Sequence, residues 1–492
     1  MLKTFFLLFL ISLFLSTYII SFQYSLEIGI SIYGFVMIIY FCSQILFSYL
    51  NNKFYFTLAK QNWLQENNFR TFRVDMEKQG DEKKQEETTV TEFPFKSVLL
   101  MIGHREREDY WEKALLSIKN IKPDGLLKTY LIIDGNQEED DYMMDKTVEI
   151  FNNHPLSFEI ETIQISQRGK RGAMFYGLQK IKTDFPQQEK NIDVVVSDSD
   201  TELDENSILR LQECLHSNSN NGCATGLLHI YNLQDGLLPK MINARYSYAF
   251  MIERAAASYF GCMTCCSGPI SIYRLEILDE MIIQKFITQK FLNVKCEPGD
   301  DRHLTNLVLA KGYYARQTNM SKAGTEAPET WFRFLNQQLR WSRSFYRELY
   351  WQLKAIEKQS YYLCAMSAYE NLFPIFLTFW LFKILYGNKD FYYLLKGFII
   401  SIAILLVRTT ILFIYLRNWS AWYNVVYYPT YLLFLLPTKI YAMFSVLNNN
   451  WVTNPRKKGL FANISCSPYF VFIGFWNLAI IGGLIRHIIL WI

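Results

Sequence analysis

The sequence predicts a soluble α/β domain inserted between groups of membrane-spanning helices. The chain has 492 residues, 50% of them hydrophobic, and the apolar stretches concentrate at its two ends. Between them, short β-branched runs alternate with helix-like windows, which is typical of an α/β domain with a mostly parallel sheet. The net charge of +4 is too small to indicate a nucleic-acid partner.

Residues 1–50 are expected to form two transmembrane helices. Residues 4–22 and 28–50 contain no charged side chain, and each is close to the ~20 apolar residues that a helix needs to cross hydrocarbon. A cleaved signal peptide is the alternative for the first segment. No small-residue cleavage site is evident, and a second span follows at once, which favours a retained helix.

Residues 51–95 are interpreted as a charged linker, which includes the low-complexity run MEKQGDEKKQEETTVT at 76–91. Lys and Arg are plentiful after the second span and absent from the short loop between the spans. The positive-inside rule therefore places the middle of the chain in the cytosol.

Residues 96–330 are expected to form the α/β domain. Strands are predicted over 97–102, 129–133, 158–165, 192–196 and 224–228, and helices over 138–151, 171–181, 207–216 and 240–259. Parallel sheets bind ligands beyond the carboxyl ends of their strands. Two polar clusters fall there: Asp134-Gly135-Asn136, and Ser197-Asp198-Ser199-Asp200.

Several of these polar residues can carry chemistry. Asp198 and Asp200 have the spacing of a site for Mg²⁺ or Mn²⁺ shared with substrate phosphates, with a solvated acidic loop as the alternative. The Gly169-Lys170-Arg171 run before a helix can face a diphosphate, or can be an ordinary basic loop. Gly299-Asp300-Asp301-Arg302 supplies a second acidic pair, and a carboxylate there can act as a general base, although an Asp at this place can also be an N-cap.

Nine cysteines are mostly scattered singly, which indicates free thiols in a reducing compartment. The run Cys262-Met-Thr-Cys265-Cys266-Ser267-Gly268-Pro269 has no second cysteine pair that would complete a tetrahedral metal site. It is interpreted as a tight turn beside a groove.

Residues 331–358 are expected to form an amphipathic helix in the membrane interface. At about 100° per residue, one face carries Arg333, Gln337, Arg340, Arg343 and Arg347, and the other carries Phe334, Leu335, Leu339, Trp341, Phe345, Tyr346 and Leu349. The cationic face would then look back at the α/β domain.

Residues 359–492 are expected to hold further membrane helices, with spans over 362–386, 391–416 and 468–490. The apolar segment 421–447 contains Pro437 and Lys439 and is interpreted as re-entrant or interfacial. This choice keeps the basic loop within 448–460 in the cytosol.

Taken in order, DGN, GKR, SDSD, CCSGP, GDDR and QQLRW, followed by a Trp-containing basic loop, resemble the processive family 2 glycosyltransferases, specifically the hyaluronan synthases. The matching phrases are IDGNQEEDDYMM at 133–144, ERAAASYFG at 253–261, GDDRHLTN at 299–306 and NQQLRWSRSFYRE at 336–348. The resemblance covers nearly the whole chain. It implies a GT-A nucleotide-sugar fold in a multi-pass plasma-membrane protein whose catalytic domain is cytosolic.

The resemblance also implies roles for individual residues. Nucleotide-sugar contacts would come from His104, Arg105, Glu106, Asp134, Lys170, Arg171, Asp198, Gln337 and Arg340, and from Trp451, Thr453 and Arg456 in a gating loop at 448–460. Cys266, Ser267, Gly268 and Trp341 would border the acceptor. Asp301 would be the base, with Arg302 beside it, and Asp198 and Asp200 would hold Mn²⁺ or Mg²⁺.

The implied activity is alternating, inverting transfer of GlcUA and GlcNAc from UDP-GlcUA and UDP-GlcNAc to a growing polysaccharide that leaves through the lipid bilayer. A chitin or chito-oligosaccharide synthase, which uses UDP-GlcNAc alone, remains an open alternative because the rhizobial type shares QQLRW. A third interpretation is a membrane transporter or scaffold with a nucleotide-sensing domain, since Arg408 lies within a predicted span.

Overall fold

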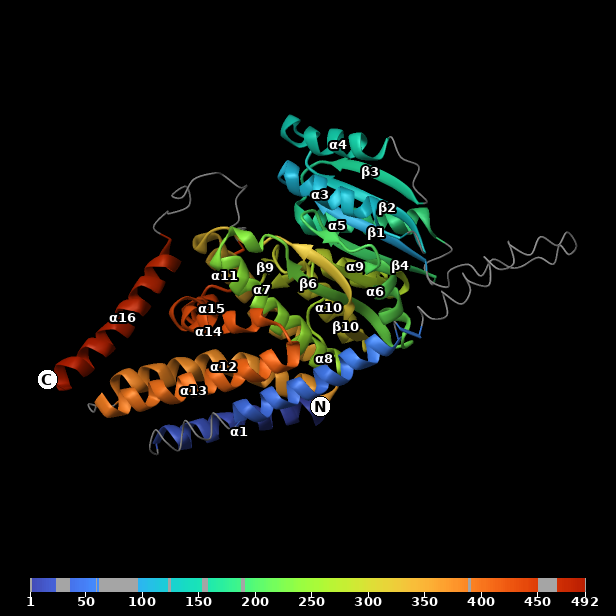
Figure 1. The fold of residues 1–492 in the computed structure, drawn as a ribbon. Helices are drawn as coiled ribbons and strands as arrows, with labels where there is room; N and C mark the ends of the chain where they lie inside the picture. Colours follow the sequence, from blue (N-terminus) through green and yellow to red (C-terminus); the bar gives the residue numbers. More distant parts are fainter. Residues whose placement is uncertain are drawn as a thin grey trace, which may run out of the picture.

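The computed structural model describes residues 2–23, 36–58, 60–61, 96–122, 125–152, 158–186, 191–387, 391–449 and 467–491. An α/β domain lies at one end of the molecule, and long helices from both ends of the chain extend away from it side by side (Figure 1). This is the predicted arrangement of a domain between two helical groups.

The domain is built on an eight-stranded sheet with the order β3-β2-β1-β4-β7-β6-β10-β5. Its strands are β1 (Lys96–Gly103), β2 (Leu126–Asp134), β3 (Glu159–Ile165), β4 (Ile192–Asp198), β5 (Glu202–Leu203), β6 (Asn221–Ile230), β7 (Ser271–Arg274) and β10 (Tyr314–Thr325). Pairs β1/β2, β2/β3, β1/β4 and β6/β10 are parallel, whereas β7 is antiparallel to both β4 and β6 and β5 is antiparallel to β10. All five predicted strands are present in this mixed sheet.

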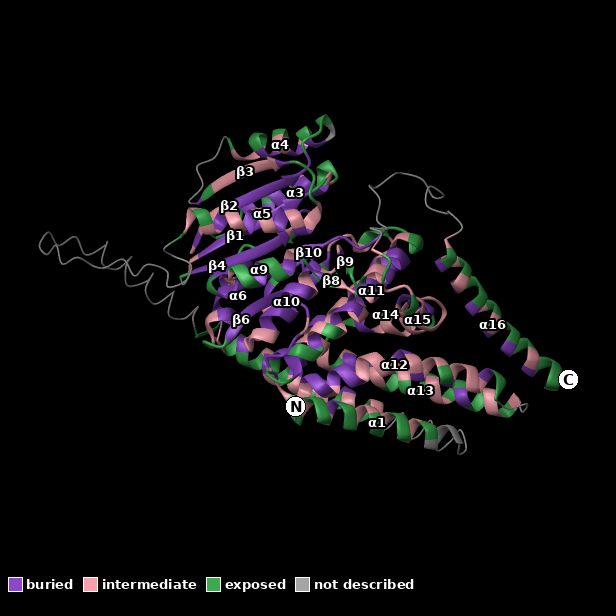
Figure 2. Cartoon of the chain, turned by 180° about the vertical axis from the view of Figure 1, so that it is seen from behind, coloured by how far each residue is buried: buried purple, intermediate pink, exposed green. Residues whose placement is uncertain are grey.

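Helices cover both faces of the sheet, so that its central strands are buried on both sides (Figure 2). The domain contains α3 (Glu108–Lys119), α4 (Glu138–Phe151), α5 (Gly169–Asp184), α6 (Ser207–His216), η1 (Leu233–Asp235), α7 (Leu237–Tyr248), the π-helix η2 (Ala249–Arg254), α8 (Ala255–Tyr259), η3 (Leu275–Ile277), α9 (Glu280–Ile287) and α10 (Asp300–Lys311), with a small hairpin of β8 (Lys290–Phe291) and β9 (Val294–Lys295). Because side chains alternate along a strand, Leu100 joins the cluster under α5 and α10, and Leu99 joins the cluster under α3 and α6.

The predicted amphipathic helix is α11 (Trp331–Ile356). Its apolar face is covered in part by protein, since Phe334, Leu335 and Leu339 pack in one buried cluster with Leu435 of η5 and Tyr469 of α16. This part of the apolar face of α11 is therefore packed against protein, and the place of the helix in the membrane interface stays a prediction. The helix lies between the α/β domain and α15 (Figure 1).

Four helices in the described parts of the chain are long and apolar enough to cross a membrane, over Leu2–Ile19, Tyr361–Tyr386, Phe391–Leu416 and Pro468–Leu490. They belong to α1 (Leu2–Gln23), α12 (Tyr361–Tyr386), α13 (Phe391–Leu416) and α16 (Pro468–Trp491). The segment predicted as interfacial consists of η4 (Trp419–Trp422), α14 (Tyr423–Thr430), η5 (Tyr431–Leu435) and α15 (Leu436–Phe444), and is not among these candidates.

The predicted second span is described only from residue 36, and residues 36–58 are helical. Residues 51–58, assigned from sequence to the linker, thus extend this helix towards the domain. Asn51 donates to the carbonyl of Gln317 (3.1 Å) and Asn52 to that of Met251 (3.1 Å). These contacts dock the helix over 36–58 on β10 and η2.

Candidate active site

Three of the motifs singled out in the sequence meet where β4 ends. The Lys170 Nζ of α5 lies 2.6 Å from Asp198 Oδ1 at the end of β4 and 3.2 Å from Asp300 Oδ2 at the start of α10. Burial lowers the pKa of Lys170, but attraction by the two carboxylates outweighs it and raises the pKa above its ordinary value. The pKa of Asp300 is lowered, because Lys170 offsets the cost of burial. This is a preformed cation-carboxylate centre.

Asp301, the predicted base, lies beside this centre. Its Oδ2 accepts from the Cys265 thiol (3.4 Å) and its Oδ1 from the Arg302 backbone N–H (2.7 Å). Burial raises the pKa of Cys265 to about 12, so the thiol stays protonated and donates to the carboxylate. Asp301 is therefore oriented by its neighbours, and its own side chain is only partly buried.

The CCSGP turn borders both carboxylates. The Cys266 N–H donates to Thr305 Oγ1 of α10 (2.8 Å), and Arg254 donates to the Ser267 hydroxyl. A Cβ at Gly268 would lie 2.8 Å from Asp198 Oδ2, which is too close for any other residue without a shift. The predicted acceptor residues thus lie in a turn between Asp198 and Asp301.

The QQLRW motif faces the same acidic centre from α11. The guanidinium of Arg340 is mostly buried, which lowers its pKa, and Asp300, Asp301 and Asp198 oppose that shift. Gln337 is half-buried one turn earlier, and Trp341 is 37% exposed. Lys170 and Arg340 therefore place two cations around three carboxylates.

Polar contacts fix α11 against α10, and sequence reasoning missed them. The Glu348 carboxylate is buried and accepts from Gln289 Nε2 (2.5 Å) and Asn306 Nδ2 (3.1 Å), with His303 Nδ1 at 3.2 Å. Arg347 donates to the carbonyl of Pro298 (3.1 Å), just before the GDDR motif. Arg347 and Glu348 lie on the inner face of α11. Because buried charges are usually paired, they were the signal in the sequence for polar partners on a neighbouring element.

His104, Arg105 and Asp134, which are predicted to contact the nucleotide sugar, lie at the ends of β1 and β2. His104 Nδ1 lies 2.5 Å from the carbonyl of Asp134, and Asp134 Oδ1 accepts from the Arg168 N–H (2.7 Å). Arg105 is held differently, by an ion pair with the buried Asp140 (3.1 Å).

Glu106 connects this loop to the acidic motif. Its Oε2 accepts from the Ser199 hydroxyl (3.2 Å), which lies between Asp198 and Asp200. The loop after β1 is therefore tied to the strand end that carries the predicted metal residues.

Arg171 is a correction to the predicted site. Its side chain is 2% exposed and donates to the carbonyls of Glu297 (2.9 Å) and Phe286 (3.0 Å), with its guanidinium 5.1 Å from the Phe286 ring centre. Neighbouring residues on a helix point about 100° apart, so Arg171 is turned away from Lys170 into the packing against α9. Its positive charge still helps to lower the pKa of Asp300.

The donor set suits a hard divalent cation. The described residues contain no group of three or more His, Cys, Asp or Glu side chains that could hold a metal ion. Mg²⁺ bound together with a phosphorylated ligand needs only one or two protein carboxylates, and the Lys170 ammonium marks a place beside Asp198 where positive charge is favourable. Asp198 can therefore hold such an ion, and Asp200 as its second ligand stays a prediction. Trp451, Thr453 and Arg456 lie outside the described residues, so the gating loop stays a prediction.

Charged groups continue from the site into the helices. Arg245 pairs with Glu253 (2.8 Å), and the Arg408 guanidinium of α13 lies 4.7 Å from the Tyr248 ring centre. Lys439 of α15 interacts with Arg245 and Glu253 through its charge. Arg408 thus belongs to a polar cluster adjoining the catalytic domain.

Comparisons with known proteins show the family of this chain. Residues 95–344 match the family model described as glycosyltransferase like family 2. Hyaluronan synthase 1 of Xenopus laevis is 32% identical over 418 residues, covering 74% of this chain and 68% of that protein. Human hyaluronan synthase 3 is 31% identical over 416 residues, covering 78% of this chain and 74% of that protein. A mannosyltransferase of Pyrobaculum calidifontis, solved with GDP-Man and Mn²⁺, superposes with a TM-score of 0.44 at 12% identity, over 84% of this chain and 100% of that chain.

The family match rules out the interpretation as a non-catalytic transporter or scaffold. The predicted α/β glycosyltransferase domain between membrane helices is confirmed. The chain is a membrane glycosyltransferase that belongs to family 2, among its hyaluronan synthase-like members.

Proposed function

We propose that this enzyme polymerises UDP-GlcNAc and UDP-GlcUA into hyaluronan at the cytosolic face of the plasma membrane and passes the growing polysaccharide outward between its helices. The relatives it matches carry the name hyaluronan synthase. The observation that carries the proposal is the Lys170 ammonium held between Asp198 and Asp300, with Arg340 facing the same carboxylates. This arrangement is suited to the diphosphate of a nucleotide sugar.

Departure of UDP develops negative charge, which fixed cations stabilise best in a partly buried site. Lys170 and Arg340 supply that positive charge in this chain. Asp198 and Asp200 would hold Mn²⁺ or Mg²⁺, which, when bound, polarises the diphosphate as a Lewis acid. His104 and Asp134 lie where the uridine would enter, at the ends of the parallel strands.

Asp301 would take the proton from the acceptor hydroxyl, with Arg302 beside it. Cys265 donates to one carboxylate oxygen and holds the group in place. A single base without a second carboxylate nucleophile implies direct displacement and inversion, hence a β-linkage. The acceptor sugar would lie along the turn at Cys266, Ser267 and Gly268, with Trp341 as a stacking surface.

The charges among the helices favour an acidic polymer over a neutral one. Arg245, Arg408 and Lys439 are half-buried near one another, with Glu253 as a shared counter-charge. Cations at such a place attract the carboxylates of glucuronate residues, whereas a chitin chain has no charge that they could bind.

Membrane vesicles containing the enzyme should be given each UDP-sugar singly and both together, with Mn²⁺ or Mg²⁺. We expect polymer only with both sugars, and complete degradation of that polymer by a hyaluronan-specific lyase. Polymer made from UDP-GlcNAc alone, with no effect of UDP-GlcUA, would instead establish a chitin or chito-oligosaccharide synthase. The variant Asp301→Asn should bind UDP and make no polymer, and retained synthesis would remove Asp301 as the base.

A further inference from the structure

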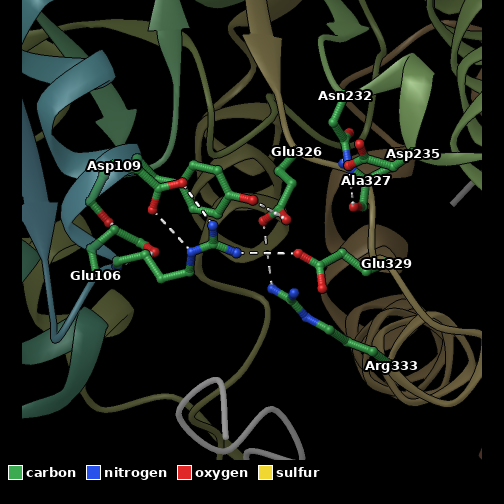
Figure 3. A network of polar contacts seen from close by, with 11 residues as sticks. Glu106, Asp109, Asn232, Asp235, Glu326, Ala327, Glu329 and Arg333 are labelled. Carbon is green, nitrogen blue, oxygen red and sulfur yellow. Dashed lines mark hydrogen bonds and ion pairs between the residues drawn. The ribbon is translucent and has the colours of Figure 1, made fainter. Parts of the chain in front are cut away.

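A network of polar contacts joins the loop after β1 to the segment that leads into α11 (Figure 3). Arg107 forms a two-pronged ion pair with Asp109, with Nε 3.0 Å from Oδ1 and Nη2 2.7 Å from Oδ2. Its Nη1 reaches Glu329 Oε1 at 3.2 Å, more than two hundred residues further along the chain. In Figure 3, Asp109 lies on one side of the network, and Glu326 and Glu329 approach it together from another segment.

The buried member of the network is the pair of Tyr110 and Glu326. The Tyr110 hydroxyl of α3 donates to Glu326 Oε1 at 2.5 Å, and both residues are buried, at 6% and 8% exposure. Arg333 Nη2, in the first turn of α11, lies 3.7 Å from the other oxygen of Glu326. The Arg107 guanidinium covers the Tyr110 ring at 4.3 Å. A hydrogen bond to a buried carboxylate is stronger than one between neutral groups.

The same segment is held on its other side by Asn232, which follows β6. The Asn232 side chain donates to the carbonyl of Ala327 (3.1 Å) and accepts from its N–H (2.8 Å). Residues 326–329 are therefore a short strap with a fixed anchor at Asn232, and the contacts to Arg107 and Tyr110 set where the loop after β1 sits against it.

Both ends of this network lead to the proposed donor site. On the loop side, Glu106 is bonded to Ser199, which lies between Asp198 and Asp200. On the helix side, Arg333 and Arg340 are two turns apart on the same face of α11. A displacement of the strap would consequently change the separation between Arg340 and the acidic strand end.

We propose that Tyr110 and Glu326, assisted by Arg107 and Glu329, form a latch that positions α11 against the loop after β1 and thereby sets the affinity for the UDP moiety of the donor. These are positioning residues, because they act on Arg340 and on the acidic strand end through α11 and through the loop after β1. The inference rests on the proposed use of a UDP-sugar but not on which sugars are polymerised. Because the latch fixes an arrangement used equally by the bound substrate and the transition state, its loss raises KM with little change in kcat.

The test is a double-mutant cycle of Tyr110→Phe and Glu326→Gln in the full-length enzyme in nanodiscs, read by UDP binding and by donor KM and kcat. Each single variant should raise the UDP Kd and the donor KM three- to tenfold, with kcat within twofold. The UDP Kd of the double variant should be no higher than that of the weaker-binding single variant, since the two substitutions remove the same hydrogen bond between Tyr110 and Glu326.

The matched control is Tyr130→Phe. Tyr130 also donates to a carboxylate, Asp184 Oδ2 (2.7 Å), but at the opposite end of α5 from Lys170. This variant should lose a similar amount of thermal stability and keep its UDP Kd within twofold. Unchanged UDP binding in Tyr110→Phe, an equal effect in Tyr130→Phe, or additive effects in the double variant would each overturn the latch. The binding of free UDP does not depend on which polymer is made. A different polymer product would therefore refute the hyaluronan proposal without affecting the test of the latch.

Discussion

Gly299, the residue before Asp300, is expected to tolerate no side chain. It has φ +94° at the start of α10, and a Cβ built on it would collide with Ser344 Oγ and lie 2.9 Å from Ser344 Cβ of α11. The left-handed conformation costs a non-glycine residue about 1–2 kcal/mol, and overpacking against the rigid helix adds about 1–3 kcal/mol. Gly299→Ala should therefore destabilise the folded state by about 2–5 kcal/mol.

Gly312, at the other end of α10, separates these two costs. It has φ +105°, and a Cβ there would meet only the side chain of Lys358, at the ordinary contact distances of 3.6 Å to Cδ and 4.0 Å to Cβ, so Gly312→Ala should show the backbone cost alone. Thermal unfolding and donor kinetics would be measured for both variants and for Gly299→Ala with Ser344→Gly, which removes the collision.

We expect Gly299→Ala to lose more stability and much more kcat than Gly312→Ala, because the collision displaces Asp300 and Asp301. Adding Ser344→Gly should restore part of both. Equal stability and activity of the two alanine variants would refute the close contact between Gly299 and α11.

Three further outcomes follow from buried groups. Glu348→Ala should cost about 3–5 kcal/mol in denaturant unfolding, because His303 and the amide donors lose a buried charged partner; a loss below 1 kcal/mol would contradict this. The pKa of Asp300 is held below its ordinary 3.8 by Lys170, so its contribution to stability is present above about pH 4 and is lost as the pH falls further. Wild-type stability should accordingly fall more steeply below pH 4 than that of Asp300→Asn, and parallel curves would count against the ion pair. Cys265, with a pKa raised to about 12 by burial, should resist maleimide at pH 8 until the protein is unfolded, as mass spectrometry would show; labelling of the folded enzyme would contradict its burial.

The parts of the fold that the sequence predicts well are those with strong local patterns. The β4 run Ile192–Asp198 is apolar and β-branched, and it ends directly in the acidic motif. Helices α4 and α6 have the predicted bounds, since each combines helix-forming residues with a polar start. The meeting of the SDSD and GKR motifs follows from the rule that parallel strands bring their carboxyl ends to one edge. The GDDR motif follows the antiparallel β8/β9 hairpin, so this rule does not place it.

The missed elements depend on contacts that are distant in sequence. Strand β10 reads YARQTNMSKAGT, with neither alternation nor an apolar run, and it is a strand because β6 pairs with it over most of its length. Strand β7 has only four residues and is antiparallel between β4 and β6. Helix α3 is different: Trp111, Leu115 and Ile118 are buried at helical spacing, so its signal was present in the sequence.

The error at Arg171 has a simple geometric cause. Lys170 and Arg171 are adjacent on one helix, so only one of them can point at the end of β4. The burial pattern of α5, with Arg171, Met174, Leu178 and Ile181 inward, assigns the inward face to Arg171. The GKR motif thus locates the turn that faces the end of β4. The helix period decides which of its two cations, Lys170 or Arg171, points at Asp198.

The register of α11 shows why its apolar face alone does not define the site. Packing of Phe334 and Leu339 is non-directional, and neighbouring positions along a helix offer similar apolar area. The contacts that change sharply when the helix slides are polar: Glu348 with α10, Arg347 with the Pro298 carbonyl, and Arg333 with Glu326. A buried carboxylate together with its partners adds little net stability compared with well-packed apolar residues at the same positions. We infer that the buried Glu348 carboxylate serves to hold Arg340 in one position relative to Asp300 and Asp301. The free energy spent on burying Glu348 thus goes into fixing that position.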